Sequence, residues 1–211
     1  MYFKFKRFLD CIFSFIGLII LSPVFIIIVI LIKLESRGPV LFKQKRIGIN
    51  KEEFDILKFR TMKITTPRDT PTHQLNNPGQ YITKVGNFLR KTSLDELPQI
   101  WNILVGEMSF VGPRPALWNQ YDLIEERDKY GVNNILPGLT GWAQVNGRDE
   151  LPIYLKVRLD AEYVEKANAK MDIQCLLRTV VSVIKSEGIV EGSIVTKNEI
   201  ASTKENKHNE I

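Results

Sequence analysis

A long apolar run without a charged residue, residues 11–32, is the feature that most constrains how this chain can fold. As a helix, these 22 residues would extend for about 33 Å, enough to cross a hydrocarbon core of roughly 30 Å. A crossing helix usually has one flank that is poor in lysine and arginine. Here both flanks are basic, with Lys4, Lys6 and Arg7 before the run and Lys33 and Arg37 after it. The run therefore predicts a membrane segment, and its flanks do not favour a simple crossing.

Ser22 and Pro23 lie at the middle of this run. Proline removes a backbone donor and clashes with the preceding turn, and a serine hydroxyl can bind the carbonyl that is freed. We predict a re-entrant hairpin, in which the helix breaks at Ser22 and Pro23 and both ends return to the same membrane face. A spanning helix with a proline kink is the alternative. A cleavable signal peptide does not fit, because the run exceeds an h-region of about 7–15 residues and no small-x-small site precedes Lys33.

The remaining residues are sufficient for one domain with a modest core. We predict a membrane anchor over residues 1–36, a single domain over 37–192 and a polar, disordered tail over 193–211. No second apolar run is long enough to span a membrane, which excludes a polytopic carrier or channel. The two cysteines and two histidines are isolated, which excludes a disulfide framework and a zinc site and favours a reducing cytoplasmic setting.

The formal net charge of +5 is concentrated next to the apolar run. Residues 33–63 contain nine lysines and arginines against four acidic residues. Such a basic segment suits anionic lipid head groups or phosphorylated substrates. Nucleic acid is the competing partner, but the charge lies beside the membrane segment and no recognised nucleic-acid motif is present. We therefore expect the lipid bilayer, and not nucleic acid, as a partner.

Periodicity predicts an α+β fold that is mainly helical. Residues 39–62 contain two β-prone runs around a polar turn at 48–51, which is typical of a hairpin. Residues 172–186 are amphipathic and either pack on the core or lie at the membrane interface. Further helices are expected after Ser93, over 116–130 and over 152–168. Loops are expected over 63–83 and 132–150.

Asp95 and Glu96 lie in the segment with the most chemical possibilities. Ser93 precedes Glu96 with the spacing of a capping box, and acidic residues in a first turn complement the helix dipole. That structural role is one interpretation. The other is functional, because adjacent carboxylates can hold Mg²⁺ with water and substrate phosphates, and one carboxylate can attack phosphorus. Arg90 nearby can bind phosphate.

Other candidate side chains lie where prolines or glycines constrain the backbone. Prolines on both sides of Arg114 lower the entropy cost of presenting its guanidinium to a phosphate, although a rigid turn with a solvated arginine is equally compatible. The glycines of residues 136–148 permit either tight turns or the close approach of a ligand. The candidates for phosphate or substrate binding are Lys58, Arg60, Arg90, Arg114, Gln144 and Arg148.

These motifs together resemble the small monotopic phosphoglycosyl transferases, also called bacterial sugar transferases. They occur in the family's order and cover about residues 1–190. The resemblance implies the family's minimal catalytic unit, with the domain over 37–192 as its catalytic domain. The matching segments are Ser22-Pro23, Gln44-x-Arg46-x-Gly48, Lys58–Met62, Ser93–Gln99, Gly112–Pro115 and Pro137–Gly147.

The resemblance implies that a UDP-sugar gives its sugar-1-phosphate to undecaprenyl phosphate and that UMP is released. Asp95 would be the nucleophile and the Mg²⁺ ligand, with Glu96 as the second acid of the pair. The domain would lie on the cytoplasmic face of the bacterial inner membrane, and downstream glycosyltransferases would be further partners. The product would start a capsule, exopolysaccharide, O-antigen or glycoprotein glycan. The cations would bind phosphates, and residues 144–148 the nucleotide or sugar.

Two other functions remain open from the residues. A Mg²⁺-dependent hydrolase of nucleotide or lipid pyrophosphates would use the same acids, although the sequence has no obvious second metal cluster or catalytic histidine. A non-enzymatic, membrane-anchored interaction module would leave Asp95 and Glu96 beside arginines unexplained. Within the family, residues 114–120 and 147–151 resemble members that use N-acetylated, often 6-deoxy, sugars, and we expect such a donor.

Overall fold

The computed structural model describes residues 2–66, 78–147 and 151–184. Within them the chain is mostly helical with two small sheets, as the mainly helical α+β prediction requires. The predicted tail over 193–211 lies outside the described residues. The elements in chain order are α1 (Tyr2–Glu35), β1 (Leu41–Ile47), η1 (Ile49–Lys51), β2 (Glu53–Phe59), η3 (Pro78–Gln80), α2 (Lys84–Lys91), η4 (Leu94–Glu96), α3 (Gln99–Val105), β3 (Ser109–Val111), α4 (Tyr121–Asp128), η5 (Val132–Asn134), β4 (Gly138–Thr140), α5 (Trp142–Val145), α6 (Ile153–Lys166) and α7 (Ala169–Ile184).

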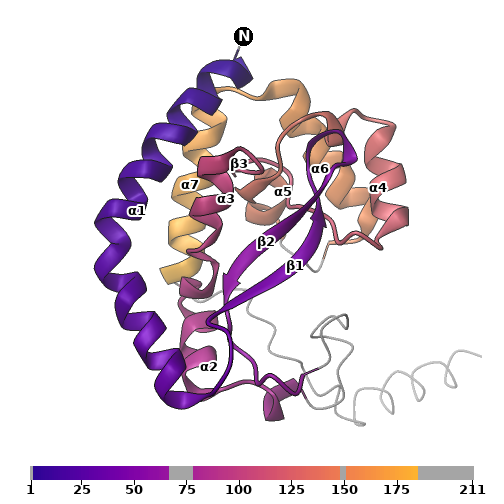
Figure 1. Ribbon diagram of the computed structural model, residues 1–211. Helices are drawn as coiled ribbons and strands as arrows, with labels where there is room; N and C mark the ends of the chain where they lie inside the picture. The colour runs from indigo at the N-terminus through magenta and orange to yellow at the C-terminus, as the bar shows by residue number, and fades with distance from the viewer. Residues whose placement is uncertain (1, 67–77, 148–150, 185–211) are drawn as a thin grey trace, which may run out of the picture.

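The apolar segment forms one continuous helix, so the expected break into two helices does not occur. α1 contains Pro23 in its interior, and Figure 1 shows the helix bowed around the rest of the molecule. The Ser22 hydroxyl donates to the carbonyl of Ile19 at 2.8 Å. In a helix this carbonyl would otherwise accept the N–H that Pro23 lacks. The predicted role of Ser22 is therefore confirmed, and it explains how the helix continues through the proline.

The first half of α1 turns a polar stripe toward the domain. Lys6, Asp10 and Ser14 follow one another at intervals of one helical turn and are all buried. Lys6 Nζ lies 2.7 Å from Asp172 Oδ2 on α7, and the Ser109 hydroxyl on β3 donates to Asp10 Oδ2 at 2.7 Å. Because a buried charge is costly unless it is paired, these contacts determine which face of α1 points inward.

The second half of α1 is held by apolar packing and by a helix cap. Ile28 and Ile32 pack with Phe59 and Leu89 in a buried cluster. The Glu35 carboxylate accepts the first two backbone N–H groups of α2, at 2.6 and 2.9 Å. Such a carboxylate satisfies donors that have no partner inside the helix and complements the helix dipole. Both ends of α1 therefore contact the same body.

The predicted hairpin is present. β1 and β2 pair antiparallel, with Leu41 opposite Phe59 and Ile47 opposite Glu53. The connection at residues 48–51 is the predicted turn. Alternation along β2 places Ile56 and Lys58 on the inner face and leaves Asp55 on the outer face.

A second sheet forms where the sequence predicted an irregular loop. β4 pairs parallel with β3, with Ser109 opposite Gly138. The pairing continues beyond the strands, because Gly112 N donates to Thr140 O and Gly138 N donates to Pro113 O, both at 2.9 Å. A Cβ atom on Gly138 would lie 2.1 Å from Gly112 N. The glycines here serve the close approach of two backbones, one of the alternatives that the sequence left open.

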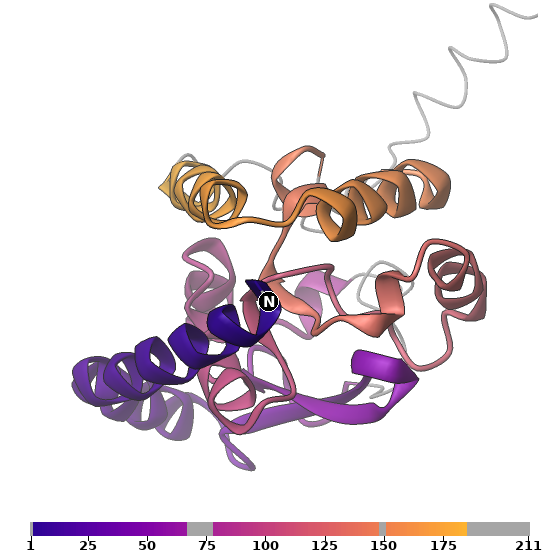
Figure 2. The same ribbon diagram turned by 90° about the horizontal axis from the view of Figure 1, so that it is seen from above.

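The predicted helices are present with shifted ends. The helix expected over 116–130 is shorter, as α4, whereas α6 and α7 agree closely with the predictions over 152–168 and 172–186. Figure 2 shows α6 and α7 in one layer, with the β1–β2 hairpin on the opposite side of the molecule. The short β3–β4 sheet lies between them, and α7 packs on it through Cys175 and Met171.

The outward sides of α1 and α7 are strongly apolar. By length and composition α1 is a helix that can cross a membrane. α7 packs on the core, yet its other side is apolar as well. Contiguous exposed apolar surface of this kind is typical of a membrane or protein interface. The exposed side chains include Phe5, Phe8, Phe13, Ile20 and Ile27 on α1 and Ile173, Leu177, Val180 and Val181 on α7.

We predict that Gly138→Ala destabilises the protein by about 2 kcal/mol or more, because the added methyl group would overlap the backbone of Gly112. The melting temperature in detergent should fall by roughly 5 °C. Gly79→Ala is the matched control, since a Cβ atom there meets no described atom within 4 Å. Equal melting temperatures for the two variants would contradict this account of the β3–β4 pairing.

Candidate active site

Asp95 and Glu96 lie in η4, a single 3₁₀ turn between α2 and α3. The predicted capping box is wrong. Ser93 adopts a left-handed conformation with φ 56° and ψ 16°, and its side chain makes no capping hydrogen bond to the described residues. α3 begins only at Gln99. A left-handed residue with a side chain costs about 1–3 kcal/mol, so the surroundings must hold this turn in place.

Glu96 is the point at which three segments meet. Its Oε1 lies 2.6 Å from Lys58 Nζ of β2 and 3.4 Å from Arg114 Nη2, which follows β3. Burial by itself would raise the pKa of Glu96, but the charges and hydrogen bonds of Lys58 and Arg114 outweigh it and lower the pKa to about 2. Glu96 is therefore ionised at any physiological pH and serves as a fixed anchor for both cations.

Asp95 is in a different electrostatic position. Burial raises the pKa of Asp95 to about 6; the charge of Glu96 adds to this effect, whereas Lys58 and Arg90 oppose it. Asp95 is thus ionised near neutral pH but less stabilised than an ordinary aspartate. A carboxylate of this kind is more basic and more nucleophilic, and pairs of acids driven apart in pKa are typical of active sites.

Arg90 belongs to the same cluster. It lies in the last turn of α2, its charge lowers the pKa of Asp95, and its Nε donates to Thr61 Oγ1 at 3.0 Å. Together with Lys58 and Arg114 it surrounds the acids with positive charge. These three predicted phosphate-binding candidates are therefore brought together.

Arg60 is directed elsewhere. Its Nη1 donates to the Arg37 carbonyl at 2.9 Å, and its Nη2 donates to the carbonyl and the hydroxyl of Ser36 at 2.9 and 2.8 Å. The residue is buried. Arg60 thus joins the end of β2 to the segment that follows α1, and its predicted part in phosphate binding stays a prediction.

Side chains of the residues after β4 contact other parts of the protein. Gln144 Nε2 donates to the Leu139 carbonyl at 3.2 Å. The centre of the Trp142 ring lies 5.2 Å from the guanidinium carbon of Arg178 on α7. Both side chains therefore contact the surrounding chain, and the predicted part of Gln144 in substrate binding stays a prediction. Arg148 lies outside the described residues, and its predicted role is untested.

Arg46 and Arg127 were not among the predicted site residues, yet both hold the turn that carries Arg114. Arg46 Nη1 donates to the Pro115 carbonyl at 3.0 Å, and Arg127 Nη1 donates to the Arg114 carbonyl at 2.9 Å. The charged run at 125–129 is typical of a solvated helix face, so the sequence carried no signal for Arg127. For Arg46, the sequence did carry a signal, because this residue belongs to the family motif Gln44-x-Arg46-x-Gly48.

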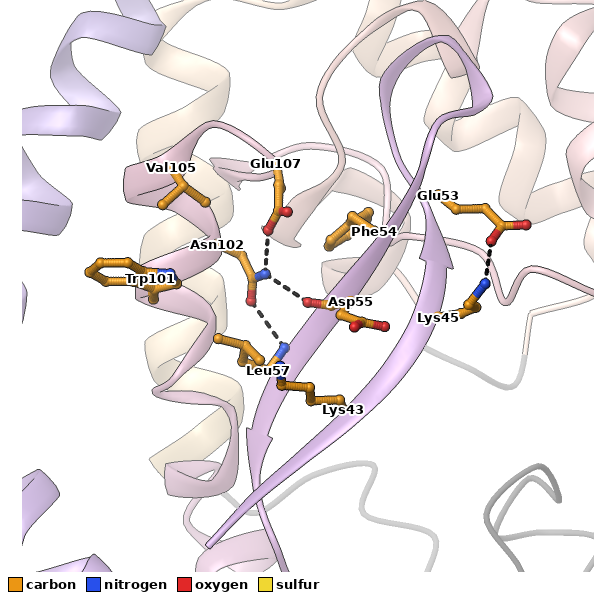
Figure 3. A pocket seen from close by; sticks show the side chains of 10 residues that line it. All are labelled: Lys43, Lys45, Glu53, Phe54, Asp55, Leu57, Trp101, Asn102, Val105 and Glu107. Carbon is orange, nitrogen blue, oxygen red and sulfur yellow. Dashed lines mark hydrogen bonds and ion pairs between the residues drawn. The ribbon is translucent and has the colours of Figure 1, made fainter. Parts of the chain in front are cut away.

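A groove is lined by residues of the hairpin and of α3. Figure 3 shows it between β2 and α3, with Asn102 at its base, and its volume is about 660 Å³. Asn102 accepts from the Leu57 N–H and donates to the Asp55 carbonyl and to Glu107, so it completes the free edge of β2. The residues that line the groove do not include Asp95 or Glu96.

The donor set around Asp95 fits Mg²⁺. Among the residues that the structure describes, no group of three or more His, Cys, Asp or Glu side chains gathers into a metal cluster. Mg²⁺ does not require one, since it usually takes one or two protein carboxylates and completes its shell with water and substrate phosphates. The incompletely compensated carboxylate of Asp95 suits such an ion, and its binding remains a proposal.

Comparison with known proteins identifies the family. A family model described as bacterial sugar transferase matches residues 1–186. The chain belongs to the bacterial sugar transferase family. The resemblance inferred from the ordered motifs is thereby confirmed, and an N-terminal apolar helix is compatible with a membrane-associated member.

Curated relatives are similar along most of this sugar transferase. It is 38% identical over 191 residues to the uncharacterized sugar transferase EpsL of Bacillus subtilis strain 168, covering 90% of this chain and 93% of EpsL. It is 35% identical over 197 residues to the exopolysaccharide production protein ExoY of Sinorhizobium fredii, covering 87% of each. It is 40% identical over 182 residues to the UDP-glucose:undecaprenyl-phosphate glucose-1-phosphate transferase of Escherichia coli K12, covering 83% of this chain but 39% of that protein.

The opposite pKa shifts of the two acids predict opposite effects on stability. Asp95 has a raised pKa in the folded state, so its ionisation opposes folding as the pH rises from about 4 to about 6. Asp95→Asn should therefore raise the melting temperature at pH 7.5, and the gain should shrink toward pH 4. Glu96 has a lowered pKa, so its stabilisation is present above about 4.5 and is lost as the pH falls toward 2. Glu96→Gln should therefore lower the melting temperature at pH 7.5.

Thermal unfolding of both variants in detergent, without divalent cations, measures these shifts. Each isosteric amide is the control for the other, because both remove one negative charge from the same turn. Melting temperatures that change in the same direction at pH 7.5 would contradict the account in which ionised Glu96 stabilises the fold and ionised Asp95 destabilises it.

Proposed function

We propose that this sugar transferase transfers a sugar-1-phosphate from a UDP-sugar to undecaprenyl phosphate and releases UMP through a covalent aspartyl-phosphosugar intermediate. The observation that carries the proposal is the position of Asp95, whose pKa is raised to about 6, next to Glu96, which contacts the cations of Lys58 and Arg114. Relatives from Escherichia coli and Xanthomonas campestris are named UDP-glucose:undecaprenyl-phosphate glucose-1-phosphate transferases, which supports the same substrate classes here.

The proposed reaction has two displacements at one phosphorus. First, a carboxylate oxygen of Asp95 attacks the phosphorus that bears the sugar. A bond forms between them, the bond from that phosphorus to the bridging oxygen breaks, and UMP leaves with the electron pair. Then an oxygen of undecaprenyl phosphate attacks the same phosphorus and the Asp95 carboxylate departs, which leaves a lipid diphosphate sugar. The ionised but poorly stabilised state of Asp95 favours the first attack.

Phosphoryl transfer depends mainly on the positioning of the phosphates and on the neutralisation of their charge. The surrounding cations can supply that neutralisation. Lys58 and Arg114 are held by Glu96, and Arg90 approaches from α2. Their guanidinium and ammonium groups can bind the phosphates of donor and acceptor. Mg²⁺, held by Asp95 when bound, would add positive charge at the donor diphosphate.

We further propose that α1 is re-entrant, on the cytoplasmic side of the bacterial inner membrane. Its two ends are bound by polar groups of one domain, Lys6 by Asp172 and Glu35 by the start of α2. If α1 crossed the bilayer, its two ends would lie on opposite sides of the hydrocarbon core, and a domain on one side could not bind both. The bow of α1 and the exposed apolar side of α7 support the same arrangement. The proposed site then lies where a soluble donor meets a lipid acceptor.

The donor sugar is a finer proposal. The resemblance of residues 114–120 and 147–151 to some family members favours an N-acetylated, often 6-deoxy, sugar, while the names of three relatives refer to glucose. Assembly of an exopolysaccharide is supported by the names of two relatives, a capsule is a further proposal, and downstream glycosyltransferases remain proposed partners. A panel of UDP-sugars with undecaprenyl phosphate and Mg²⁺ identifies the donor from its UMP release.

We expect the wild type with its UDP-sugar alone to release about one UMP per active site and then stop, because the intermediate has no acceptor. Undecaprenyl phosphate should restore turnover. Asp95→Asn should lose UMP release by several orders of magnitude, because a carboxamide is not a nucleophile. Glu53→Gln, which changes an exposed acid on the outer face of the hairpin, is the matched control.

Two results would contradict this function. Continuous UMP release without the lipid would indicate the hydrolase. No release with any donor would indicate the interaction module.

The re-entrant arrangement predicts that residues 4 and 43 lie on the same side of the membrane. Lys4→Cys and Lys43→Cys, each in a Cys11→Ala background because Cys11 is exposed, should resist an impermeant thiol reagent in intact cells. Both should react once the membrane is opened. Labelling of position 4 in intact cells would show a kinked crossing instead.

A further inference from the structure

The turn that carries Arg114 is held through its carbonyl groups. The two prolines of the turn have no N–H, so these residues can accept hydrogen bonds but cannot donate them. Each of three successive carbonyls accepts a bond from a different part of the chain. The pairs are Pro113 O with Gly138 N at 2.9 Å, Arg114 O with Arg127 Nη1 at 2.9 Å, and Pro115 O with Arg46 Nη1 at 3.0 Å.

Arg127 is itself held by an ion pair with Asp160. Its Nε and Nη2 donate to Asp160 Oδ2 on α6, at 3.0 and 2.6 Å. Only 4% of the Arg127 side chain and 2% of the Asp160 side chain are exposed. A planar guanidinium can direct donors to a carboxylate and to a carbonyl at once, whereas a lysine ammonium has no such fixed geometry. The buried pair therefore sets the position of the Arg114 backbone.

We propose that Arg127, fixed by Asp160, is a positioning residue that directs Arg114 toward the phosphates of the substrate. This inference rests on the proposed function, in which Arg114 binds phosphate, and it names the residue that sets the direction of that side chain. Small misplacements of a binding group reduce transfer rates strongly. The competing explanation is that the pair only joins α4 to α6.

The test begins with Arg127→Lys, which keeps a positive charge near Asp160 and loses the planar fork. We expect kcat/KM for UMP release to fall about tenfold. Removing Arg127 alone would leave a buried, unpaired carboxylate, which destabilises proteins strongly. The second variant therefore combines Arg127→Met with Asp160→Leu, which removes both charges. It should melt near the wild-type temperature and show the same loss. Lys51→Met, which removes an exposed ion pair with Asp128 of α4, is the matched control.

A double-mutant cycle with Arg114→Lys separates positioning from a structural role. In the Arg114→Lys background, Arg127→Lys should reduce kcat/KM by less than about twofold, because there is no longer a guanidinium fork to direct. A loss of about tenfold in both backgrounds would overturn the inference and leave the proposed function intact. Wild-type kinetics for Arg114→Lys would overturn the role of Arg114 and this inference with it. Absence of UMP release from the wild type would overturn the proposed function itself.

Discussion

The partly buried charge of Glu96 is the interaction on which the rest of the site depends. A carboxylate that is largely shielded from water must be compensated, and the partners of Glu96 are Lys58 from the hairpin and Arg114 from the turn after β3. The contact brings three distant segments to one point. It also leaves the adjacent Asp95 with less compensation, which is why two neighbouring acids differ so much in pKa. One interaction thus joins the segments of the candidate site and separates the pKa values of its two acids.

Backbone packing keeps that arrangement rigid. The parallel β3–β4 pair is so close that Gly138 has no room for a side chain. The turn that follows β3 is bound through its carbonyls by Gly138, Arg46 and Arg127. Such a turn cannot adjust freely when a substrate arrives, so Arg114 is presented in one orientation. Preorganised charge of this kind is the usual means of stabilising phosphoryl transfer.

The apolar helix supports the same elements. Ile28 packs against Phe59, the residue after Lys58, and Glu35 caps the helix that carries Arg90. The part of the chain that is suited to a membrane therefore also positions two of the cations around the acids. An enzyme with a soluble donor and a lipid acceptor requires its site at the membrane surface. The contacts of α1 connect the apolar helix directly to the cations around the two acids.

The sequence by itself determined the apolar helix, the β-hairpin, the mainly helical class and the family, because these depend on local patterns and ordered motifs, and it predicted the two acids of the candidate site. Only the tertiary structure decided that Ser93 does not cap a helix, that Gly138 pairs with β3, and that Lys58 but not Arg60 reaches the acids. It also revealed Arg127, which looked like part of a solvated face. These outcomes depend on contacts between residues that are far apart in the chain, and on the cost of burying charge. No local pattern encodes which distant partner a buried side chain will meet.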